Sequence, residues 1–466
     1  MKISNIIVIG LAALSMSSCK SLYGKYERPD VNTKGLYRDS ATAAVGDTLA
    51  AADTNSFGNL EWRKVFTDPK LQFLINKALK NNPDLLNAAL NIDMAEAQLK
   101  SSKLAFLPSF SFSPSGTISS WDGNAATKVY SLPINASWNV DLFGKLLSSK
   151  RSAQMALIQT QDYKVSVQTS LIANIANMYY TLCMLDKQLE LVADMKTLVK
   201  ETWDIMKVQK DLSAGVRSTG VQAAESNYYS VLTQETDLKR QVRETENSLS
   251  LLLGQQVQTI DRNKLDEQSL PAEFSTGVGI QILRNRADVH AAEMSLAQCF
   301  YGVETARSRF YPNLSITASA AFTNSSGAGI VNPGKWLLSA VGALTQPIFQ
   351  NGQLIAGLRV AKDQYQQAYN TWQNTIYKAG SEVSNALVLY NASDEKSRIE
   401  EKQVKVLEQN VEDTKALLQS SSNKTYLEVI SAQSTLLNTQ LSKVSDDFYK
   451  MQAVVNLYYA LGGGAK

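Results

Sequence analysis

The stretch YSLPINASWNVDL, from Tyr130 to Leu142, alternates apolar and polar side chains over thirteen residues. Such period-two alternation indicates a β-strand with one apolar face and one polar face. A strand of about ten residues is long enough to cross a bilayer at a tilt, with its polar face toward a lumen. A soluble β-sandwich is the alternative. The pattern therefore predicts a membrane strand whose lipid-facing side chains are Tyr130, Leu132, Ile134, Ala136 and Trp138.

Three further stretches alternate in the same way. They are Phe106–Ile118, Leu314–Phe322 and, less regularly, Trp336–Ile348, which has apolar residues on both faces. Four strands are too few for a closed membrane barrel, because small outer-membrane barrels need at least about eight. We therefore expect several chains to share one barrel, and three chains of four strands each make a barrel of twelve.

The strands occur in pairs because the chain contains two internal repeats of about 200 residues. FLPSFSF, beginning at Phe106, resembles FYPNLSI, beginning at Phe310, at an offset of 204 residues. VQAAES at Val221 resembles VISAQS at Val429 at an offset of 208. A polar, proline-containing segment joins the two copies. We divide the chain into a signal peptide (1–18), an N-terminal linker (19–59), a first repeat (60–254), a linker (255–279) and a second repeat (280–464).

Long helices accompany the strands in each repeat. Gly144–Leu212 contains no proline and no internal glycine, and Gln353–Ser420 contains two glycines. Each stretch predicts a helix of roughly 100 Å at 1.5 Å per residue. Shorter helices are expected at Asp68–Leu104 and Val221–Gly254.

Apolar residues recur along these helices at spacings of four and three, which is typical of coiled-coil packing. In the second repeat the stripe runs from Leu437 to Tyr458 without a break. In the first repeat Lys196 and the large Trp203 interrupt it. The stripe predicts packing between helices rather than a cofactor site.

The N-terminus has the pattern of a secretion signal. Lys2 precedes the apolar run Ile6–Leu14, which is too short to span a bilayer as a helix. LSMSSC, Leu14–Cys19, resembles a bacterial lipoprotein processing site, so Cys19 is the candidate lipidated residue. Plain secretion with an incidental cysteine is the alternative. No run of 18 apolar residues follows Cys19, so we expect no membrane-spanning helix.

The composition narrows the function. Lys and Arg number 46 against 43 for Asp and Glu, and this balance argues against a nucleic-acid partner. Cys183 and Cys299 are expected to be small buried residues, and a disulfide between them is an open alternative.

The single histidine, His290, lies in NRADVHAAE, Asn285–Glu293. We expect this stretch to begin a helix, with Asp288 in its first turn and His290 on its surface. The sequence has no serine nucleophile motif, no metal-ligand spacing and no glycine-rich phosphate loop. We therefore expect no catalytic residues, no cofactor and no bound metal.

Four stretches resemble the TolC-like outer-membrane efflux channel family, in its lipoprotein branch. They are WRKVFTDPKLQFLINKALKNNPDL (Trp62–Leu85), LRNRADVHAAEMSLAQCFYGVETARSRFYPNLSI (Leu283–Ile316), LTQPIFQNGQL (Leu344–Leu354) and VNLYYALGGG (Val455–Gly464). The family usually has Arg-Pro-Asp-Val where this chain has Ala287 in place of proline. The resemblance implies a mixed α+β membrane protein: a trimeric 12-stranded β-barrel, four strands per protomer, that continues into a long α-helical coiled-coil barrel.

The resemblance also implies the function. We expect an outer-membrane channel of a tripartite efflux system, which is a passive exit duct for small molecules. The expected partners are two further copies of the chain, a periplasmic adaptor, an inner-membrane pump driven by protons, and the lipid bilayer. The expected location is the outer membrane, with a lipid anchor and an extension into the periplasm. The alternatives are a periplasmic adaptor or structural coiled-coil lipoprotein, and a channel for protein secretion or metal efflux.

Two sites follow from the resemblance. The turns between helices are expected to form a periplasmic tip that contacts the adaptor through Ala214, Gly215, Val216, Arg217, Ser218 and Asn423. The start of the last helix is expected to form a gate, with Glu428 in an acidic family position and Ser431 in a second position that has lost its acid. Lys424 lies one helical turn before Glu428 and is expected to pair with it. The alternative is that Glu428 is an ordinary solvated glutamate.

Overall fold

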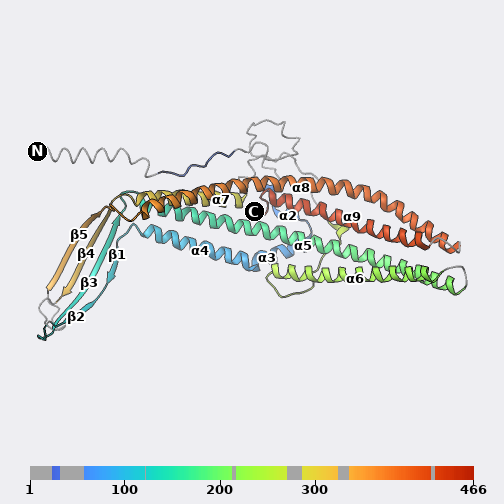
Figure 1. Ribbon diagram of the computed structural model, residues 1–466, viewed down its shortest axis with the longest axis horizontal. Coiled ribbons are helices and arrows are strands. Elements are labelled where there is room, and N and C mark those ends of the chain that lie inside the picture. Colours follow the sequence, from blue (N-terminus) through green and yellow to red (C-terminus); the bar gives the residue numbers. More distant parts are fainter. Residues whose placement is uncertain are drawn as a thin grey trace. The chain divides into compact units, whose positions relative to one another are not determined.

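The computed structural model describes residues 24–31, 57–120, 122–212, 217–269, 286–323, 335–420 and 426–465 (Figure 1). They fall into two compact units. The strand unit takes its described residues from Met1–Val31, Leu90–Asp162 and His290–Asn374. The helical unit takes its described residues from Asn32–Ala89, Tyr163–Val289 and Thr375–Lys466.

The strand unit holds one antiparallel sheet. Its strands are β1 (Ser109–Phe112), β2 (Ser115–Ser119), β3 (Thr127–Val140), β4 (Asn313–Thr323) and β5 (Lys335–Thr345). The strand order is β1-β3-β4-β5, and β2 also pairs with β3. The pairing of β3 with β4 joins the strands of the two repeats in one sheet.

The first predicted strand, Phe106–Ile118, is divided in the structure. Its residues form β1 and β2, which pair in succession with β3. Pro114 lies in the gap, and proline has no N–H to donate to the ladder. The alternating pattern continues through the gap, so periodicity alone did not reveal the break.

The strand register brings the apolar positions of all strands onto one face. Phe112 pairs with Ile134, Ile134 pairs with Ala320, and Ala320 pairs with Leu338. Directly paired residues project to the same side of a sheet, so these four form one row. The same register places the five predicted lipid-facing residues of β3 on this apolar face. Ile134 is 56% exposed, which shows that nothing in the described protomer covers the centre of the face.

Polar residues form the opposite face by the same pairing. Asn135 pairs with Ser111 on one side and with Ser319 on the other. Ser319 in turn pairs with Ser339. The fourth strand departs from this rule, as its sequence indicated, because Leu337 and Val341 lie on the polar face. The sheet therefore has one continuous apolar face and one mainly polar face.

Four helices connect to the sheet (Figure 1). They are α4 (Pro83–Leu104), α5 (Lys145–Asp211), α7 (Ala287–Ser308) and α8 (Gln353–Ser420). The two long helices predicted from the absence of proline are confirmed, since α5 has 67 residues and α8 has 68. Gly144, with a φ of 72°, makes the turn into α5, and the side chain of Asp141 accepts a 2.8 Å hydrogen bond from the Leu147 N–H.

The helical unit adds shorter helices around parts of these long ones. They are η3 (Phe57–Asn59), α2 (Trp62–Val65), α3 (Pro69–Asn81), α6 (Ser218–Leu252), η4 (Leu265–Glu267) and α9 (Tyr426–Ala460). The predicted helix Asp68–Leu104 is therefore two helices, α3 and α4. The chain breaks at Asn82, because the following Pro83 disfavours a helical conformation in the residue before it. The Asn82 side chain caps α4 by accepting from the Leu85 N–H.

The core of the helical unit follows the predicted coiled-coil stripe. Buried residues from α5, α6, α8 and α9 meet in one cluster: Leu185, Val192, Met195, Val199, Val231, Leu238, Val411, Ala432, Leu436 and Leu437. The spacings along α5 are seven, three and four residues, which keep one face of the helix against its neighbours. Within the described residues, no helix carries an apolar stretch of the length and composition required of a membrane span.

Candidate functional site

The ends of the two long helices meet the starts of the two helices that follow them. Met206 of α5, Val221 of α6, Leu418 of α8 and Val429 of α9 are buried in one small cluster. Gln209 Nε2 also donates a 2.9 Å hydrogen bond to the carbonyl of Leu418. The α5–α6 pair and the α8–α9 pair are therefore fixed to each other near the predicted tip.

Gly220 makes the closest approach in this region. A Cβ atom at this position would lie 3.0 Å from Met206 Cε and 3.3 Å from the ring of Tyr426. Glycine thus lets the start of α6 pack against the start of α9. The sequence had indicated Gly215 as part of the tip, but it gave no signal for the packing role of Gly220.

The predicted tip lies mostly outside the described residues. Ala214, Gly215, Val216, Asn423 and Lys424 all lie there. Arg217 and Ser218 are described, and both are exposed. Arg217 is the N-cap residue of α6, and its side chain makes no capping hydrogen bond, so it projects from the helix start.

The predicted gate residues share one face of α9. Glu428 lies in the first turn and is exposed, as are Ser431 and Thr435 at the next helical spacings. Val429 and Ala432, which lie beside this exposed strip on the helix surface, are buried. The proposed pairing of Glu428 with Lys424 falls outside the described residues. The side chains of Glu428, Ser431 and Thr435 are therefore exposed within the described protomer.

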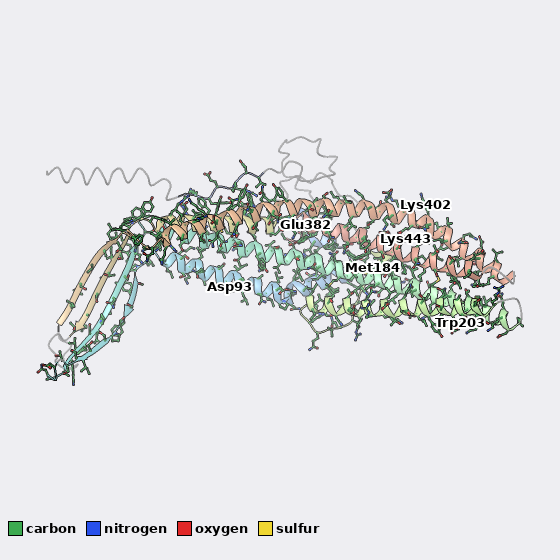
Figure 2. All side chains as sticks on the ribbon, viewed as in Figure 1. Asp93, Met184, Trp203, Glu382, Lys402 and Lys443 are labelled. Carbon is green, nitrogen blue, oxygen red and sulfur yellow. The ribbon has the colours of Figure 1, made fainter. Side chains whose placement is uncertain are left out.

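The two interruptions of the α5 stripe each find a partner on α6. Lys196 Nζ lies 2.8 Å from Glu235 Oε2. Trp203, labelled in Figure 2, stacks on Tyr228 with 5.5 Å between ring centroids, and Lys207 Nζ lies 3.1 Å from the Trp203 ring centroid. An ion pair and an aromatic stack thus replace apolar packing at these two levels. A buried hydrogen bond from Gln433 Nε2 to Thr202 Oγ1, at 2.8 Å, links α9 to α5.

Helices α8 and α9 face each other through a group of charges. Lys396 donates to Asp446 Oδ1 at 2.7 Å, and Asp446 is 3% exposed. Lys450 contacts Asp394 at 2.5 Å, and Ser397 donates to Asp447 at 2.5 Å. The polar residues therefore fix the two helices in register.

Glu400 is the exception in this group. Its Oε2 atom is buried and has no hydrogen-bond partner among the described residues, whereas Asp446 Oδ2 lies 2.6 Å from Lys396 Nζ. Burial, followed by a hydrogen bond with Asp446, raises the pKa of Glu400. The two carboxyl groups are thus placed to share a proton.

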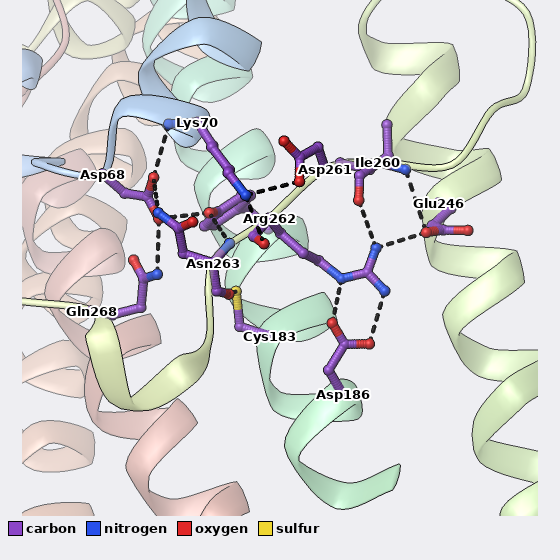
Figure 3. Close-up of polar contacts among 11 residues, drawn as sticks. Asp68, Lys70, Cys183, Asp186, Glu246, Ile260, Asp261, Arg262, Asn263 and Gln268 are labelled. Atoms are coloured by element: carbon purple, nitrogen blue, oxygen red, sulfur yellow. Dashed lines mark hydrogen bonds and ion pairs between the residues drawn. The ribbon is translucent and has the colours of Figure 1, made fainter. Parts of the chain in front are cut away.

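The segment after α6, predicted as a linker, is built into the helical unit (Figure 3). Arg262 donates from Nε and Nη2 to the two carboxylate oxygens of Asp186 on α5, at 2.6 and 2.8 Å. Its Nη1 donates to Glu246 on α6 at 2.6 Å. Although burial opposes its charge, the two carboxylates raise the pKa of Arg262. One arginine therefore links α5, α6 and the segment between the repeats.

Asp68 is a second polar centre for the same segment (Figure 3). It caps α3 by accepting from the Lys70 N–H, and it accepts further hydrogen bonds from Tyr179, Asn263 and Gln268. Burial alone would raise its pKa, but these hydrogen bonds hold the pKa of Asp68 below its usual value. The carboxylate is fully satisfied and serves to anchor the chain.

The two cysteines of the described chain are free thiols. Cys183 is buried, and its thiol donates to the carbonyl of Asn263 at 3.2 Å. Burial raises the pKa of Cys183 to about 12, so the thiol stays protonated. The open alternative of a disulfide between Cys183 and Cys299 is therefore not what the structure contains.

His290 lies on α7 and is 40% exposed at its side chain. Its Nδ1 lies 2.6 Å from Asp162 Oδ2 on α5. Asp288 lies in the first turn of α7 as predicted, where it pairs with Arg286 at 2.7 Å. Sequence reasoning missed the His290–Asp162 pair, because 128 residues separate its members. Among the described residues, no three His, Cys, Asp or Glu side chains gather as ligands for a metal ion.

An antiparallel sheet with one apolar face, joined to very long paired helices, defines the class of outer-membrane export channels. The solved structure of the outer-membrane channel OprN superimposes with a TM-score of 0.84, at 22% identity, over 95% of this chain and 99% of that one. The cation efflux system protein CusC of Escherichia coli K12 is 28% identical over 97% of this chain and 98% of its own length. The probable efflux pump outer membrane protein TtgC of Pseudomonas putida is 27% identical over 99% of this chain and 96% of its own.

The family model for outer membrane efflux proteins matches residues 74–255 and 279–463. The chain belongs to this family, as its sequence motifs indicated. It is an outer-membrane channel for efflux.

Proposed function

We propose that three copies of the chain form one channel: a 12-stranded barrel in the outer membrane that continues into a helical tunnel. The observation that carries the proposal is that the two outer edges of the sheet have no strand partner within the described protomer. Among the described strands β5 pairs with β4 alone, and β1 and β2 pair with β3 alone. Because each neighbour in the order β1-β3-β4-β5 is antiparallel, β5 of one copy lies antiparallel to β1 of the next. Open edges need a partner, and a closed ring of copies supplies it.

The apolar face of the sheet contacts lipid in this proposal. Tyr130, Leu132, Ile134, Ala136 and Trp138 point outward, and the polar face with Asn135 lines the lumen. The alternative, a periplasmic adaptor or structural lipoprotein, has no use for so large an exposed apolar face.

The mass of the purified complex in mild detergent, and its flotation with lipid vesicles, test the assembly. We expect a complex of three chains that floats with vesicles and migrates differently on a gel before and after heating. A single chain of 51.1 kDa that remains soluble once its lipid is removed would overturn the proposal.

The channel is a passive exit duct for small molecules. An inner-membrane pump driven by protons supplies the energy, and a periplasmic adaptor joins the pump to the channel. Metal cations are the second candidate cargo, favoured by the similarity to CusC over nearly the whole chain. Deleting the gene and measuring the sensitivity of the cells to a panel of metal cations and a panel of organic toxins separates the two. Loss of a metal channel should raise sensitivity to metal cations alone, and loss of a channel for organic molecules should raise sensitivity to the toxins alone.

Cys19 carries the lipid in our proposal. Arg151 of α5 donates to the carbonyl of Gly24 at 3.0 Å, so the chain is held five residues after Cys19. Radiolabelled palmitate is expected to enter the wild-type protein and to be absent from Cys19→Ser. Equal labelling of the two proteins would exclude Cys19 as the acylated residue.

The periplasmic tip contacts the adaptor through Ala214, Gly215, Val216, Arg217, Ser218 and Asn423. The exposed Arg217 and Ser218, at the start of α6, support this placement. Gly215→Asp is expected to abolish copurification of the adaptor and to reduce export while the trimer stays intact. Unchanged copurification and export would contradict the assignment.

Glu428 forms the gate in our proposal, with Ser431 on the same face and Lys424 as its partner. The exposure of its side chain in the first turn of α9 supports this reading. Three symmetry-related carboxylates around one axis repel one another and attract cations. A solvated glutamate on the outer surface of the channel is the alternative.

Current through single trimers in a planar bilayer tests the gate. Glu428→Ala is expected to raise conductance and to weaken block by divalent cations. Glu412→Ala removes an exposed acid elsewhere on α8 and is the matched control. If both variants conduct like the wild type, Glu428 is surface and the gate lies elsewhere.

A further inference from the structure

The four chain connections between sheet and helices share one order of residue types. Each carries an exposed apolar residue close to the strand end: Leu107, Leu142, Tyr311 and Phe349. Each then carries an exposed cation on the helix side. These cations are Lys100 and Lys103 of α4, Lys145 of α5, Arg309 just after α7, and Arg359 of α8. We call these five residues the basic collar.

The basic collar lacks anionic partners. None of its five members forms an ion pair within the described part of the chain, although many other surface cations do. Two acids lie at the level of the collar, and both are engaged: Glu304 is 3% exposed and pairs with Arg307, and the Asp141 side chain accepts a hydrogen bond from the Leu147 N–H. Glu96 and Asp363 lie one helical turn farther from the sheet than Lys100 and Arg359 and form no ion pair with them within the described chain. The whole chain has a net charge of only +3, so this excess is a local feature.

Helix dipoles do not explain the collar. Lys100 and Lys103 lie near the C-terminal end of α4, where the dipole favours a cation. Lys145 and Arg359, however, lie in the first two turns of α5 and α8, where the dipole disfavours one. Cations at both kinds of helix end therefore point to an external anion.

The position of the collar indicates which anion. At 1.5 Å per residue, its helical members lie within about 10 Å of the helix ends that face the sheet. Gly24 provides a second measure of this level, because Arg151, near the start of α5, binds its carbonyl. Five residues of extended chain span at most about 17 Å, so the attachment point of a lipid on Cys19 lies within that distance of Gly24.

We propose that the basic collar binds the phosphate groups of anionic phospholipids in the periplasmic leaflet of the outer membrane. The apolar residues of the connections lie in the interface, and the long Lys and Arg side chains extend their charged ends to the headgroups. The collar sets the depth of the sheet in the bilayer. This inference rests on the proposed placement of the apolar sheet face in lipid.

The test uses the full-length protein in phosphatidylcholine vesicles that contain spin-labelled phosphatidylglycerol or spin-labelled phosphatidylcholine. We expect the wild type to prefer phosphatidylglycerol by about threefold or more at low salt and to lose the preference at high salt. The collar variant replaces Lys100, Lys103, Lys145, Arg309 and Arg359 with Gln. It is expected to show no preference.

A matched variant controls for net charge. It replaces five exposed cations of the helical unit that have no ion pair within the described chain: Lys80, Lys200, Lys210, Arg243 and Lys402. We expect it to keep the wild-type preference. Equal preference for phosphatidylglycerol in the collar and control variants would overturn the proposed role of the collar in lipid binding. A wild type that fails to float with the vesicles would instead overturn the proposed placement of the sheet, so the two failures are distinct.

Discussion

Arg262 is a single side chain that holds three segments of the helical unit together. Its own side chain is 12% exposed, and that of its partner Glu246 is 6% exposed. Two desolvated charges of opposite sign stabilise a fold mainly by their mutual pairing, and removal of one leaves the other buried without a partner. The polar segment between the repeats is therefore part of the folded core.

Arg262→Met is expected to lower the free energy of unfolding by about 3–5 kcal/mol, because it leaves Glu246 charged in a buried site. Thermal unfolding in detergent measures the effect. Arg262→Met combined with Glu246→Leu is expected to recover part of the loss. Arg240→Gln, which removes an exposed ion pair with Glu244, is the control and is expected to leave the melting temperature unchanged. A melting temperature for Arg262→Met equal to that of the control would show that the link is dispensable.

Residue-scale features were the least predictable from the sequence. The exposed alternation of β3 was visible, because period two is a local property. The contacts of Arg262 and Asp68 were not, because their partners lie 76 and up to 200 residues away. The same reason hid the Asp162 partner of His290. Polar residues in a stretch with proline and glycine suggest a solvated linker, and no local signal shows that they bind distant helices.

Helices α8 and α9 are joined by a group of charged side chains, and the protonation of one of them, Glu400, depends on pH. Glu400 and Asp446 face each other, with Lys396 and Asp394 on α8 and with Asp447, Lys443 and Lys450 on α9 around them. Because the folded-state pKa of Glu400 is raised, the folded protein holds a proton there more tightly than the unfolded chain does. Protonated Glu400 therefore contributes to the free energy of unfolding at acidic pH. This contribution is lost as pH rises from the ordinary pKa of 4.5 through the raised pKa of the folded state.

Glu400→Gln is expected to remove this pH dependence, because the amide can donate to Asp446 without titrating. Hydrogen exchange along α8 and α9, measured across a series of pH values and corrected for intrinsic rates, tests it. The wild type is expected to lose protection around residues 400 and 446 as pH rises, and Glu400→Gln to keep it. Glu408→Gln, at an exposed site of α8, is the control. Parallel profiles for wild type and Glu400→Gln would exclude the shared proton.

At the scale of elements, the sequence predicted the long helices well and the breaks poorly. The bounds of α5 and α8 agree to within a residue with the proline-free stretches Gly144–Leu212 and Gln353–Ser420. The division at Asn82 follows from Pro83, because proline is compatible with the first turn of a helix but not with its interior. The prediction of one helix overlooked this signal. The gap between β1 and β2 was hidden, because alternation continues across it.

For the whole molecule, the proposed placement of the sheet in lipid has a direct energetic consequence. Ile134 lies at the centre of β3, in the row that also holds Phe112, Ala320 and Leu338. Ile134→Lys is expected to cost about 2–4 kcal/mol of folding free energy in vesicles if that row lies near the bilayer midplane. Urea titration followed by heat-modifiable gel migration measures it. Asn135→Lys, on the polar face, is expected to cost far less, and equal costs would contradict the assignment of faces.

The pairing of β3 with β4 predicts which contacts form early and which form late during folding. Phe112 and Ile134 pair within one hairpin, 22 residues apart, whereas Val140 and Leu314 are 174 residues apart. Closing so long a loop is slow unless the intervening chain is already compact. Helices α5, α6 and α7 lie between the two strands, so their packing shortens the effective distance before the hairpins join. We therefore expect the helices between the two strands to pack first, and the pairing of β3 with β4 to form last.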